Sequence, residues 1–296
     1  MPEGHALHRL ARAFTACGVG RRVRASSPQG RFAASAAVID NTTMTAAWAW
    51  GKHLFLEFDR PGENVVHVHL GLYGSWRFSG APSFAVPSHI GAPRVAQEHF
   101  AENVKIAPED GWMLPEPRGQ VRLRLIFDDG VADLTGPAAC ELMDRSGVAG
   151  VLARLGPDPL RPDCDPERFV AACRASGRPV GQLVMDQGVV AGPGNIYRAE
   201  CLFRVGISPL RPGKRVSADR LRALYADLAQ TMADGLERGQ IVTVRPEDVP
   251  DPLTDAEAAR FYVYHRAGRP CLSCGRTVLM EPMAGRKLYR CATCQR

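Results

Sequence analysis

The 296-residue sequence contains no apolar run near the ~20 residues that a helix needs to cross a bilayer. Its start does not resemble a secretory signal, because His5, His8 and Arg9 interrupt the apolar stretch nearest to it. No segment repeats at a fixed period, which argues against a solenoid. We therefore expect a protein of the cytoplasm that has no membrane partner.

Paired cysteines of the kind that form a disulfide framework are also lacking. The nine cysteines are an odd number, and five of them follow no regular spacing: Cys17, Cys140, Cys164, Cys173 and Cys201. Such scattered thiols are typical of a reducing compartment, where they stay free and buried.

The other four cysteines form two C-x2-C pairs separated by sixteen residues, namely Cys271, Cys274, Cys291 and Cys294. This spacing predicts one tetrahedral zinc ion at the base of a β-hairpin. Four thiolates leave no open coordination position, so we expect the zinc to be structural. The hairpin would carry Arg286 near its turn, where a guanidinium can reach a phosphate.

A net excess of positive charge is lacking except near the end of the chain. The net charge is +6, yet residues 260–296 hold eight Arg or Lys against one acid, so this segment carries 8 − 1 = +7 and the rest 6 − 7 = −1. A zinc ion with four thiolates adds 2 − 4 = −2, which leaves +5. A basic surface concentrated in this way favours nucleic acid as the partner.

Hydrophobic periodicity divides the chain into two parts. Residues 3–17 predict an amphipathic helix ended by Gly18. Two-residue alternation then predicts antiparallel strands in a sandwich, at residues 23–27, 44–50, 53–58, 65–70, 75–78, 121–127 and 131–134. Residues 79–120 are rich in Pro, Gly and Ala and predict a long loop.

A Pro-rich hinge at residues 156–162 precedes the second part. Helical patterns follow at residues 166–175, 179–187, 195–204 and 217–237, with Ser217 as an N-cap. The fold class expected is therefore α+β. We expect an N-terminal β-sandwich domain at 1–135, a linker at 136–162, a helical domain at 163–258 and a zinc finger at 259–296.

The first residues carry reactive groups. If Met1 is removed, Pro2 presents a secondary amine, and α-amino groups titrate near about 7.7–8.0. Such an amine can attack C1′ of a nucleotide sugar to give an iminium, which then drives elimination of the 3′ phosphate. Glu3 can donate a proton as the sugar ring opens. A Met-Pro start alone is common, so the inference depends on the other motifs.

Lys52 and three histidines lie on or beside the predicted strands. Lys52 is as consistent with a solvated strand end as with a cation beside a reacting sugar. His67 and His69 are two residues apart and share a strand face. A metal site made of these two with His53 is conceivable, but packing or polar pairing is the favoured interpretation.

Two loops offer candidate contacts with DNA. Leu72 and Tyr73 stand between glycines on a turn, where they would fill the void left by an extruded base or cover a hairpin tip. Gly192-Pro193-Gly194-Asn195 precedes a helix that carries Arg198. Its glycines would let backbone amides approach a phosphate, with Asn195 as a further donor.

Taken together, these motifs resemble the bacterial formamidopyrimidine-DNA glycosylase and endonuclease VIII family over essentially the whole chain. The matching segments are Met1-Pro2-Glu3-Gly4, Gly51-Lys52, residues 69–74, residues 185–187 with 192–197, and the terminal zinc hairpin. The resemblance implies two lobes: a β-sandwich flanked by helices, and a helical lobe with a helix-two-turns-helix element and the zinc finger. It also implies a bifunctional DNA glycosylase and AP lyase of base excision repair.

The family's roles carry over to matching positions here. The resemblance implies that Pro2 is the Schiff-base nucleophile, Glu3 the acid that assists base loss and Lys52 the proton donor for β-elimination. Arg286 would hold phosphate and serve δ-elimination, and Asn195 would bind the backbone, with Arg198 beside it. The products would be a free damaged base and a nicked strand.

The absence of one family motif indicates which damaged base to expect as substrate. Formamidopyrimidine-type members carry an Asp-Pro-Arg-Arg-Phe-Gly wedge, whereas the corresponding region here reads Val131 to Gly136. Leu72 and Tyr73 instead resemble the void fillers of endonuclease VIII, which implies oxidised pyrimidines as substrates. Ala6 stands where familiar members have Glu, and Gly71 where endonuclease VIII has Gln.

Two other interpretations compete with the glycosylase. A non-enzymatic zinc-hairpin protein that binds damaged or bent DNA would need the cysteines, Asn195 and Arg286 but no free Pro2. A metal hydrolase built on the three histidines is the more distant alternative. For the glycosylase we expect damaged DNA as partner, a monomer and association with the nucleoid.

Overall fold

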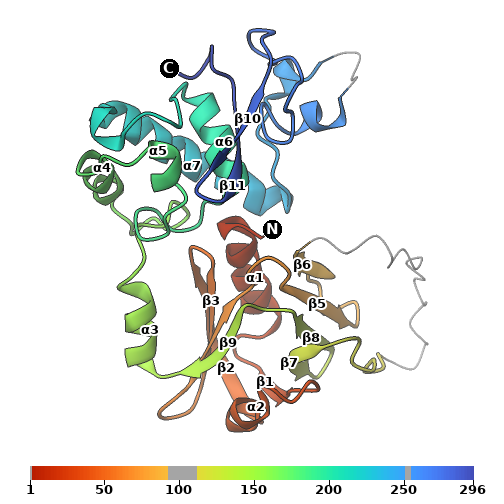
Figure 1. The fold of residues 1–296 in the computed structure, drawn as a ribbon. Helices are drawn as coiled ribbons and strands as arrows, with labels where there is room; N and C mark the ends of the chain where they lie inside the picture. The colour runs from red at the N-terminus through yellow and green to blue at the C-terminus, as the bar shows by residue number, and fades with distance from the viewer. Residues whose placement is uncertain (1, 93–111, 251–254) are drawn as a thin grey trace. The chain divides into compact units, whose positions relative to one another are not determined.

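The computed structural model describes residues 2–92, 112–250 and 255–296, and the chain forms two compact units (Figure 1). The first unit consists of residues 1–2 and 6–153, and the second of residues 3–5 and 154–296. Residues 93–111 of the predicted loop lie outside the described residues, as does Met1.

Helix α1 (Gly4–Cys17) forms where the apolar spacing predicts it. Leu10 and Phe14 are fully buried on its apolar face, and Gly18 and Val19 donate their N–H groups to the carbonyl of Phe14 at its end. Gly18 is itself constrained, because a Cβ there would come within 2.9 Å of the sulfur of Met44. The glycine therefore ends the helix and lets a strand pack beside it.

The described residues of the first unit form nine antiparallel strands, which confirms the predicted antiparallel β fold. They are β1 (Arg22–Ser26), β2 (Thr42–Trp50), β3 (His53–Phe58), β4 (Val65–His69), β5 (Ser75–Gly80), β6 (His89–Gly91), β7 (Val121–Phe127), β8 (Gly130–Thr135) and β9 (Ala139–Met143). Their order is β6-β5-β8-β7-β1-β2-β3-β4-β9, so β1 joins the two halves.

The two halves of this sheet face each other across one core. Leu54 and Val66 come from the β3–β4 half, Leu125 and Trp76 from the β7–β5 half, and all four are fully buried in the same cluster as Phe14. Burying such side chains contributes about 1.5–3 kcal/mol each. The packing of both halves and α1 around this core is the predicted sandwich with a flanking helix.

Several elements of this unit differ from the sequence prediction. Helix α2 (Ala33–Ile39) was not predicted, and β6 lies within the expected loop at 79–120. The expected linker at 136–162 contains β9 and helix α3 (Arg145–Leu152). Strand β9 pairs with β4 along its whole length, so its structure comes from a long-range partner rather than from local alternation.

The second unit is mainly helical. Its α-helices are α4 (Pro166–Arg174), α5 (Val180–Leu183), α6 (Asn195–Arg204) and α7 (Ala218–Arg238). Asp165 and Ser217 accept first-turn N–H groups as N-caps, and Gly239 ends α7 in the left-handed conformation. The helix expected at 179–187 is a single turn, α5, because the N–H groups after it enter turns.

Where the structure describes this unit, it also has three short 3-10 turns and one hairpin. The turns are Gly213–Arg215, Pro246–Asp248 and Ala256–Ala259, and the hairpin consists of β10 (Leu279–Met283) and β11 (Arg286–Arg290). The hairpin turn at Ala284 and Gly285 has φ of 50° and 73°, as a two-residue hairpin turn with left-handed residues requires.

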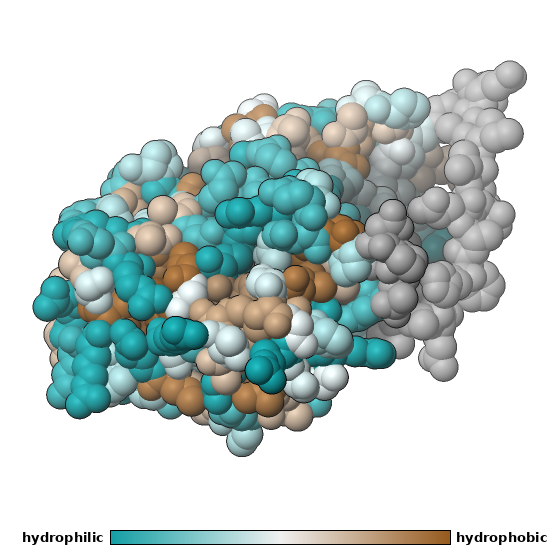
Figure 2. Space-filling view, turned by 90° about the horizontal axis from the view of Figure 1, so that it is seen from above, coloured by the Kyte–Doolittle hydropathy of each residue, from teal (hydrophilic) through white to brown (hydrophobic). Residues whose placement is uncertain are grey.

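Hydrophilic residues cover much of the face seen in Figure 2, with hydrophobic residues scattered among them. Among the described residues, no helix is both long enough and apolar enough to cross a membrane.

Candidate nucleic-acid site and metal centre

The carboxylate of Glu3 caps helix α6. Its Oε2 accepts the N–H of Gly194 at 2.7 Å, and its Oε1 accepts the N–H of Ile196 at 2.9 Å. The N–H of Tyr197 lies 3.5 Å from Oε2. The N-cap residue, Gly194, has no side chain to do this, so an acid 191 residues earlier in the chain supplies the cap. A carboxylate at a helix N-terminus is stabilised by these amides and by the helix dipole.

Gly194 makes this close approach possible. A Cβ at Gly194 would lie 2.6 Å from Cδ of Glu3, which is too close for any side chain. The neighbouring Gly4 donates its N–H to the carbonyl of Gly192 at 2.9 Å, which ties the start of α1 to the same glycine-rich loop. Glu3 is fully buried as a result.

Asn195 and Arg198 connect the start of α6 to the zinc hairpin. Nδ2 of Asn195 and a terminal nitrogen of Arg198 both donate to the carbonyl of Lys287, each at 2.9 Å. The same nitrogen of Arg198 also donates to Oδ1 of Asn195. The three residues thus fix the amide group of Asn195 and the backbone of β11 relative to each other.

Arg198 is almost completely buried, so its guanidinium supports this contact from within. Burial, and after it the positive charge of Arg286, lower the pKa of Arg198 to about 10, against the opposing effect of the charge of Glu3. The group stays protonated at neutral pH. The contact of Arg198 with DNA stays a prediction, and the structure shows its guanidinium donating to Asn195 and to the Lys287 carbonyl.

Arg286 is the first residue of β11 and is exposed, as the hairpin expected from the sequence requires. Its proximity to Arg198 places two guanidinium groups near the first turn of α6. Like charges repel each other, and a phosphate bound at the exposed Arg286 would relieve that repulsion. The second unit therefore brings together Glu3, Asn195 and Arg286 with their supporting residues.

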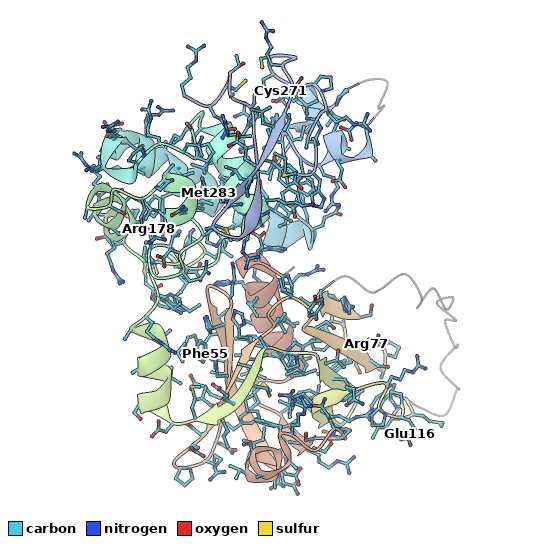
Figure 3. The ribbon with its side chains drawn as sticks, viewed as in Figure 1. Phe55, Arg77, Glu116, Arg178, Cys271 and Met283 are labelled. Atoms are coloured by element: carbon cyan, nitrogen blue, oxygen red, sulfur yellow. The ribbon has the colours of Figure 1, made fainter. Side chains whose placement is uncertain are left out.

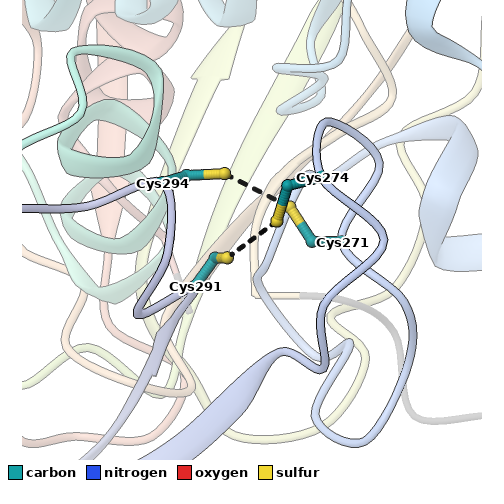
Figure 4. Close-up of side chains that lie close together, drawn as sticks. All are labelled: Cys271, Cys274, Cys291 and Cys294. Carbon is teal, nitrogen blue, oxygen red and sulfur yellow. Dashed lines mark hydrogen bonds between the residues drawn. The ribbon is translucent and has the colours of Figure 1, made fainter.

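The four predicted cysteines form a cluster that could hold a metal ion (Figure 4). Sγ of Cys271 lies 3.8 Å from that of Cys294, and Sγ of Cys274 lies 3.5 Å from that of Cys291. Tetrahedral zinc with bonds of about 2.3 Å to sulfur implies S···S distances of about 3.8 Å. The backbone N–H of Arg276, and after it the neighbouring thiols of the cluster, lower the pKa of Cys274 to about 7, which favours the thiolate that a metal binds.

The other predicted site residues lie in the first unit. Pro2 is buried, and Lys52 is half-buried in the two-residue turn between β2 and β3. Leu72 and Tyr73 are 50% and 80% exposed on the turn after β4. Such large apolar side chains exposed on one turn suit contact with a partner better than packing within the unit.

The three histidines do not form a metal centre in the structure. In the described part of the chain, the cysteine cluster is the one group of three or more ligands with suitable geometry. His53 and His67 are instead joined by a nitrogen-to-nitrogen hydrogen bond of 2.8 Å. This finding favours the polar pairing expected from the sequence over the metal hydrolase.

Sequence analysis missed Glu200, which organises the segment before the zinc hairpin. Its buried carboxylate accepts the N–H groups of three consecutive residues, Tyr262, Val263 and Tyr264, at 2.7–2.9 Å. Burial nevertheless raises the pKa of Glu200. The sequence could have indicated this role, because an acid within the apolar stretch of a helix needs a hydrogen-bonding partner.

Comparisons with known proteins agree with this geometry. Residues 1–130 match the formamidopyrimidine-DNA glycosylase N-terminal domain, and residues 155–246 match the formamidopyrimidine-DNA glycosylase H2TH domain. Endonuclease 8 1 of Mycobacterium tuberculosis (strain ATCC 25618 / H37Rv) is 45% identical over 298 residues, which covers 100% of both chains. The chain belongs to the formamidopyrimidine-DNA glycosylase family.

Solved structures of this family share the fold. The MutM (Fpg) protein of Thermus thermophilus has a TM-score of 0.69 at 25% identity, covering 99% of this chain and 98% of that one. The Fpg of Lactococcus lactis, non-covalently bound to DNA containing an AP site, has a TM-score of 0.72 at 20% identity, covering 99% of both chains.

Family membership confirms the predicted activity class. The chain is a DNA glycosylase with AP lyase activity, an enzyme of base excision repair. The endonuclease 8 relationship expected from the motifs is also confirmed by the full-length relative. An enzyme is thereby favoured over the non-enzymatic zinc-hairpin protein.

Proposed function

We propose that this glycosylase removes oxidised pyrimidines through a Schiff base on Pro2 and cuts the strand by β- and δ-elimination. The observation that carries the proposal is the burial of Glu3 at the N-terminus of α6, beside Asn195. Pro2 is joined to Glu3 by a peptide bond, so its Cα is about 3.8 Å from that of an immobilised residue. Because Pro2 is held in this way, it loses little conformational entropy when it takes up the geometry for attack.

The proposed reaction begins at the sugar of the damaged nucleotide. The Pro2 nitrogen attacks C1′ and loses its proton, the bond from C1′ to the damaged base breaks, and the departing base takes a proton. The bond from C1′ to the ring oxygen O4′ then breaks as Glu3 gives O4′ a proton, which opens the sugar and leaves an iminium on Pro2. The resulting iminium acidifies C2′, whose proton leaves as the 3′ phosphate is expelled. A second elimination expels the 5′ phosphate, and water releases the sugar fragment from Pro2.

Each remaining residue has a proposed role in these steps. Glu3 assists base loss, and Lys52 is the proton donor linked to β-elimination. Arg286 holds a phosphate and serves δ-elimination, in keeping with its exposure on β11. Asn195 binds the backbone beside the lesion while Arg198 positions its amide group.

The metal proposed for the four cysteines is one structural zinc ion, which would keep the hairpin folded when bound. Its thiolate donors and S···S distances suit zinc. Asn195 holds β11 at the start of α6 through the Lys287 carbonyl, so the ion would act on Arg286 only by supporting the hairpin.

The proposed preference for oxidised pyrimidines rests on two loops of the first unit. Leu72 and Tyr73 would enter the duplex where the lesion leaves it, because both are exposed on one turn. The segment after β8 reads Gly136-Pro137-Ala138 and has no large side chain to read the opposite base. We therefore propose a weak opposite-base preference. We further propose a monomer that acts on chromosomal DNA in the cytoplasm.

The test uses three duplexes of one sequence, which contain 5-hydroxycytosine, 8-oxoguanine or an abasic site. We expect faster excision of 5-hydroxycytosine than of 8-oxoguanine, with little change when the opposite base is varied. Strands ending in 3′ phosphate would report both eliminations. Preferred excision of 8-oxoguanine opposite cytosine would contradict the lesion choice, and an uncut abasic strand would contradict the lyase mechanism.

A further inference from the structure

The loop between α5 and α6 holds the start of the chain within the second unit. The carbonyl of Gly192 accepts the N–H of Gly4 at 2.9 Å, and the N–H of Gly194 donates to Oε2 of Glu3 at 2.7 Å. The residues from Ala191 to Gly194 have no polar side chain of their own. Gly192 also has a φ of 110°, which glycine adopts readily. Groups outside this segment therefore have to set its conformation.

The side-chain amide of Gln187 supplies such groups. Its Oε1 accepts the N–H of Gly192 at 3.0 Å, and its Nε2 donates to the carbonyl of Pro193 at 3.0 Å. Nε2 also donates to the carbonyl of Met185 at 3.2 Å. One planar amide thus pairs with an N–H and a C=O of successive loop residues, as the backbone of a neighbouring strand would.

Gln187 is itself held in place by the chain around it. Its backbone carbonyl accepts the N–H of Gly156 at 2.8 Å. The preceding Asp186 accepts a guanidinium N–H of Arg178, labelled in Figure 3, on Oδ2 at 2.8 Å. Oδ1 of Asp186 accepts the N–H of Gly188 at 3.1 Å. These contacts fix the backbone from which the Gln187 amide extends.

Gln187 and Glu3 are linked through a single peptide group. The carbonyl of Pro193 and the N–H of Gly194 belong to the same peptide group, which is planar and rigid. Gln187 donates to that carbonyl, and that N–H donates to Glu3. Holding one end of the plane therefore fixes the direction of the other. A hydrogen bond to the carbonyl also polarises the group and strengthens the bond that its N–H makes.

We propose that Gln187 is a positioning residue that orients the Glu3 carboxyl group for base loss, through the peptide group between Pro193 and Gly194. The inference rests on the proposed role of Glu3. Oε1 of Glu3 accepts the N–H of Ile196 and keeps a second lone pair, which can hold the proton given to O4′. The direction of that lone pair depends on the amides that hold the carboxyl group.

The two activities of the enzyme depend differently on this carboxyl group. Removal of a damaged base requires Glu3 in the proposed mechanism. An abasic sugar has no base to lose and opens to its aldehyde in water, so its Schiff base requires the amine of Pro2. Loss of the Gln187 contacts should therefore slow base excision more than it reduces trapping on an abasic duplex. A general loss of folding would reduce both.

Two substitutions interrupt the contact in different ways. Gln187→Ala removes every hydrogen bond of the side chain. Gln187→Glu keeps the size and the acceptor for the Gly192 N–H, but it replaces the donor to the Pro193 carbonyl by an oxygen. The matched control is Gln182→Ala on α5, because Gln182 is likewise half-buried and its side chain takes no part in these bonds.

The measurement is single-turnover excision of the damaged base that the wild type removes fastest, compared with borohydride trapping on an abasic duplex. We expect excision to fall at least about tenfold in both Gln187 variants, because a misplacement of about 1 Å near the reacting groups costs about 10²-fold. Trapping should stay close to the wild-type level. Gln182→Ala should match the wild type in both assays.

A double-mutant cycle with Glu3→Gln tests whether Gln187 acts through the carboxyl group. If it does, Gln187→Ala should slow the residual excision of Glu3→Gln no further. If that residual rate is too low to measure, the ratio of excision to trapping in the single variants decides.

An unchanged ratio of excision to trapping in the Gln187 variants would overturn the inference, and so would full additivity in the cycle. An equal fall in both assays counts as an unchanged ratio and would mean that Gln187 only supports the fold. If Gln187→Ala fails to fold, the isosteric Gln187→Glu variant decides. Excision by Glu3→Gln at the wild-type rate would instead refute the proposed role of Glu3, and the inference with it.

Discussion

Glu3 and Gly194 fit each other so closely that neither position tolerates a change of size. The Gly194 N–H donates to Glu3 Oε2 at 2.7 Å, and a Cβ on Gly194 would lie 2.6 Å from Glu3 Cδ. An acid near the start of the sequence thereby completes a helix in the second unit.

Gly194→Ala should displace the Glu3 carboxylate and, with it, the attached Pro2. We expect base excision to fall by about 10²-fold, because a displacement of about 1 Å at a reacting group has that effect. The loss of folding free energy should be about 1–3 kcal/mol. Single-turnover excision and chemical denaturation measure the two effects. Gly177→Ala is the control, since no atom lies within 4 Å of a Cβ there; equal activity of the two variants would refute the fit.

Removing Arg286 should weaken binding to phosphate without unfolding the hairpin. For Arg286→Ala we expect a slower δ-elimination and a salt dependence of DNA binding reduced by about one counterion. Arg276→Ala removes another exposed arginine of the zinc hairpin region and serves as the control. Binding titrations at several salt concentrations make the comparison. If the two variants behave alike, Arg286 makes no specific contact with a DNA phosphate.

Truncating the exposed turn after β4 should impair base extrusion alone. For the double variant Leu72→Ala with Tyr73→Ala, we expect excision from a damaged duplex to fall by about tenfold or more, since unstacking costs a few kcal/mol. Folding free energy should change by less than about 0.5 kcal/mol per exposed site. Cleavage of a single strand with an abasic site should be unchanged. Leu210→Ala, another exposed leucine, is the control; full activity on duplex would refute void filling.

Metal removal should unfold the hairpin and abolish DNA binding together. We expect one zinc ion per chain by elemental analysis, and loss of DNA affinity after chelation or in Cys291→Ser. Cys164→Ser should keep both, because a hydroxyl can accept the Asp158 N–H that Cys164 Sγ accepts now. Retention of binding by metal-free protein would show that the cysteines do not support the Arg286 hairpin.

Local patterns were sufficient for most of the fold. The alternation at β3 and β4 and the apolar spacing of α1 gave elements close to those observed, because one face of each is buried in a common core. The spacing of the cysteines similarly predicted the hairpin of β10 and β11. In each case the signal lies within one short segment.

Elements that depend on distant partners were missed. Strand β9 owes its structure to β4, more than 70 residues earlier, and α5 is shorter than its local pattern suggests. The contact of Glu3 with α6 joins residues 191 apart, so no local pattern could reveal it. Arg198 was expected to contact DNA, yet it is almost completely buried and donates to Oδ1 of Asn195.

The central claim is that the free amine of Pro2 forms a Schiff base with the sugar. The most direct measurement is borohydride trapping of processed, zinc-loaded protein on a duplex with an abasic site. Pro2→Gly and a protein with an acetylated N-terminus serve as comparisons. We predict a covalent adduct that maps to Pro2 and disappears when the amine is blocked. An adduct that persists after blocking, or no adduct from protein that still binds the duplex, would contradict this account.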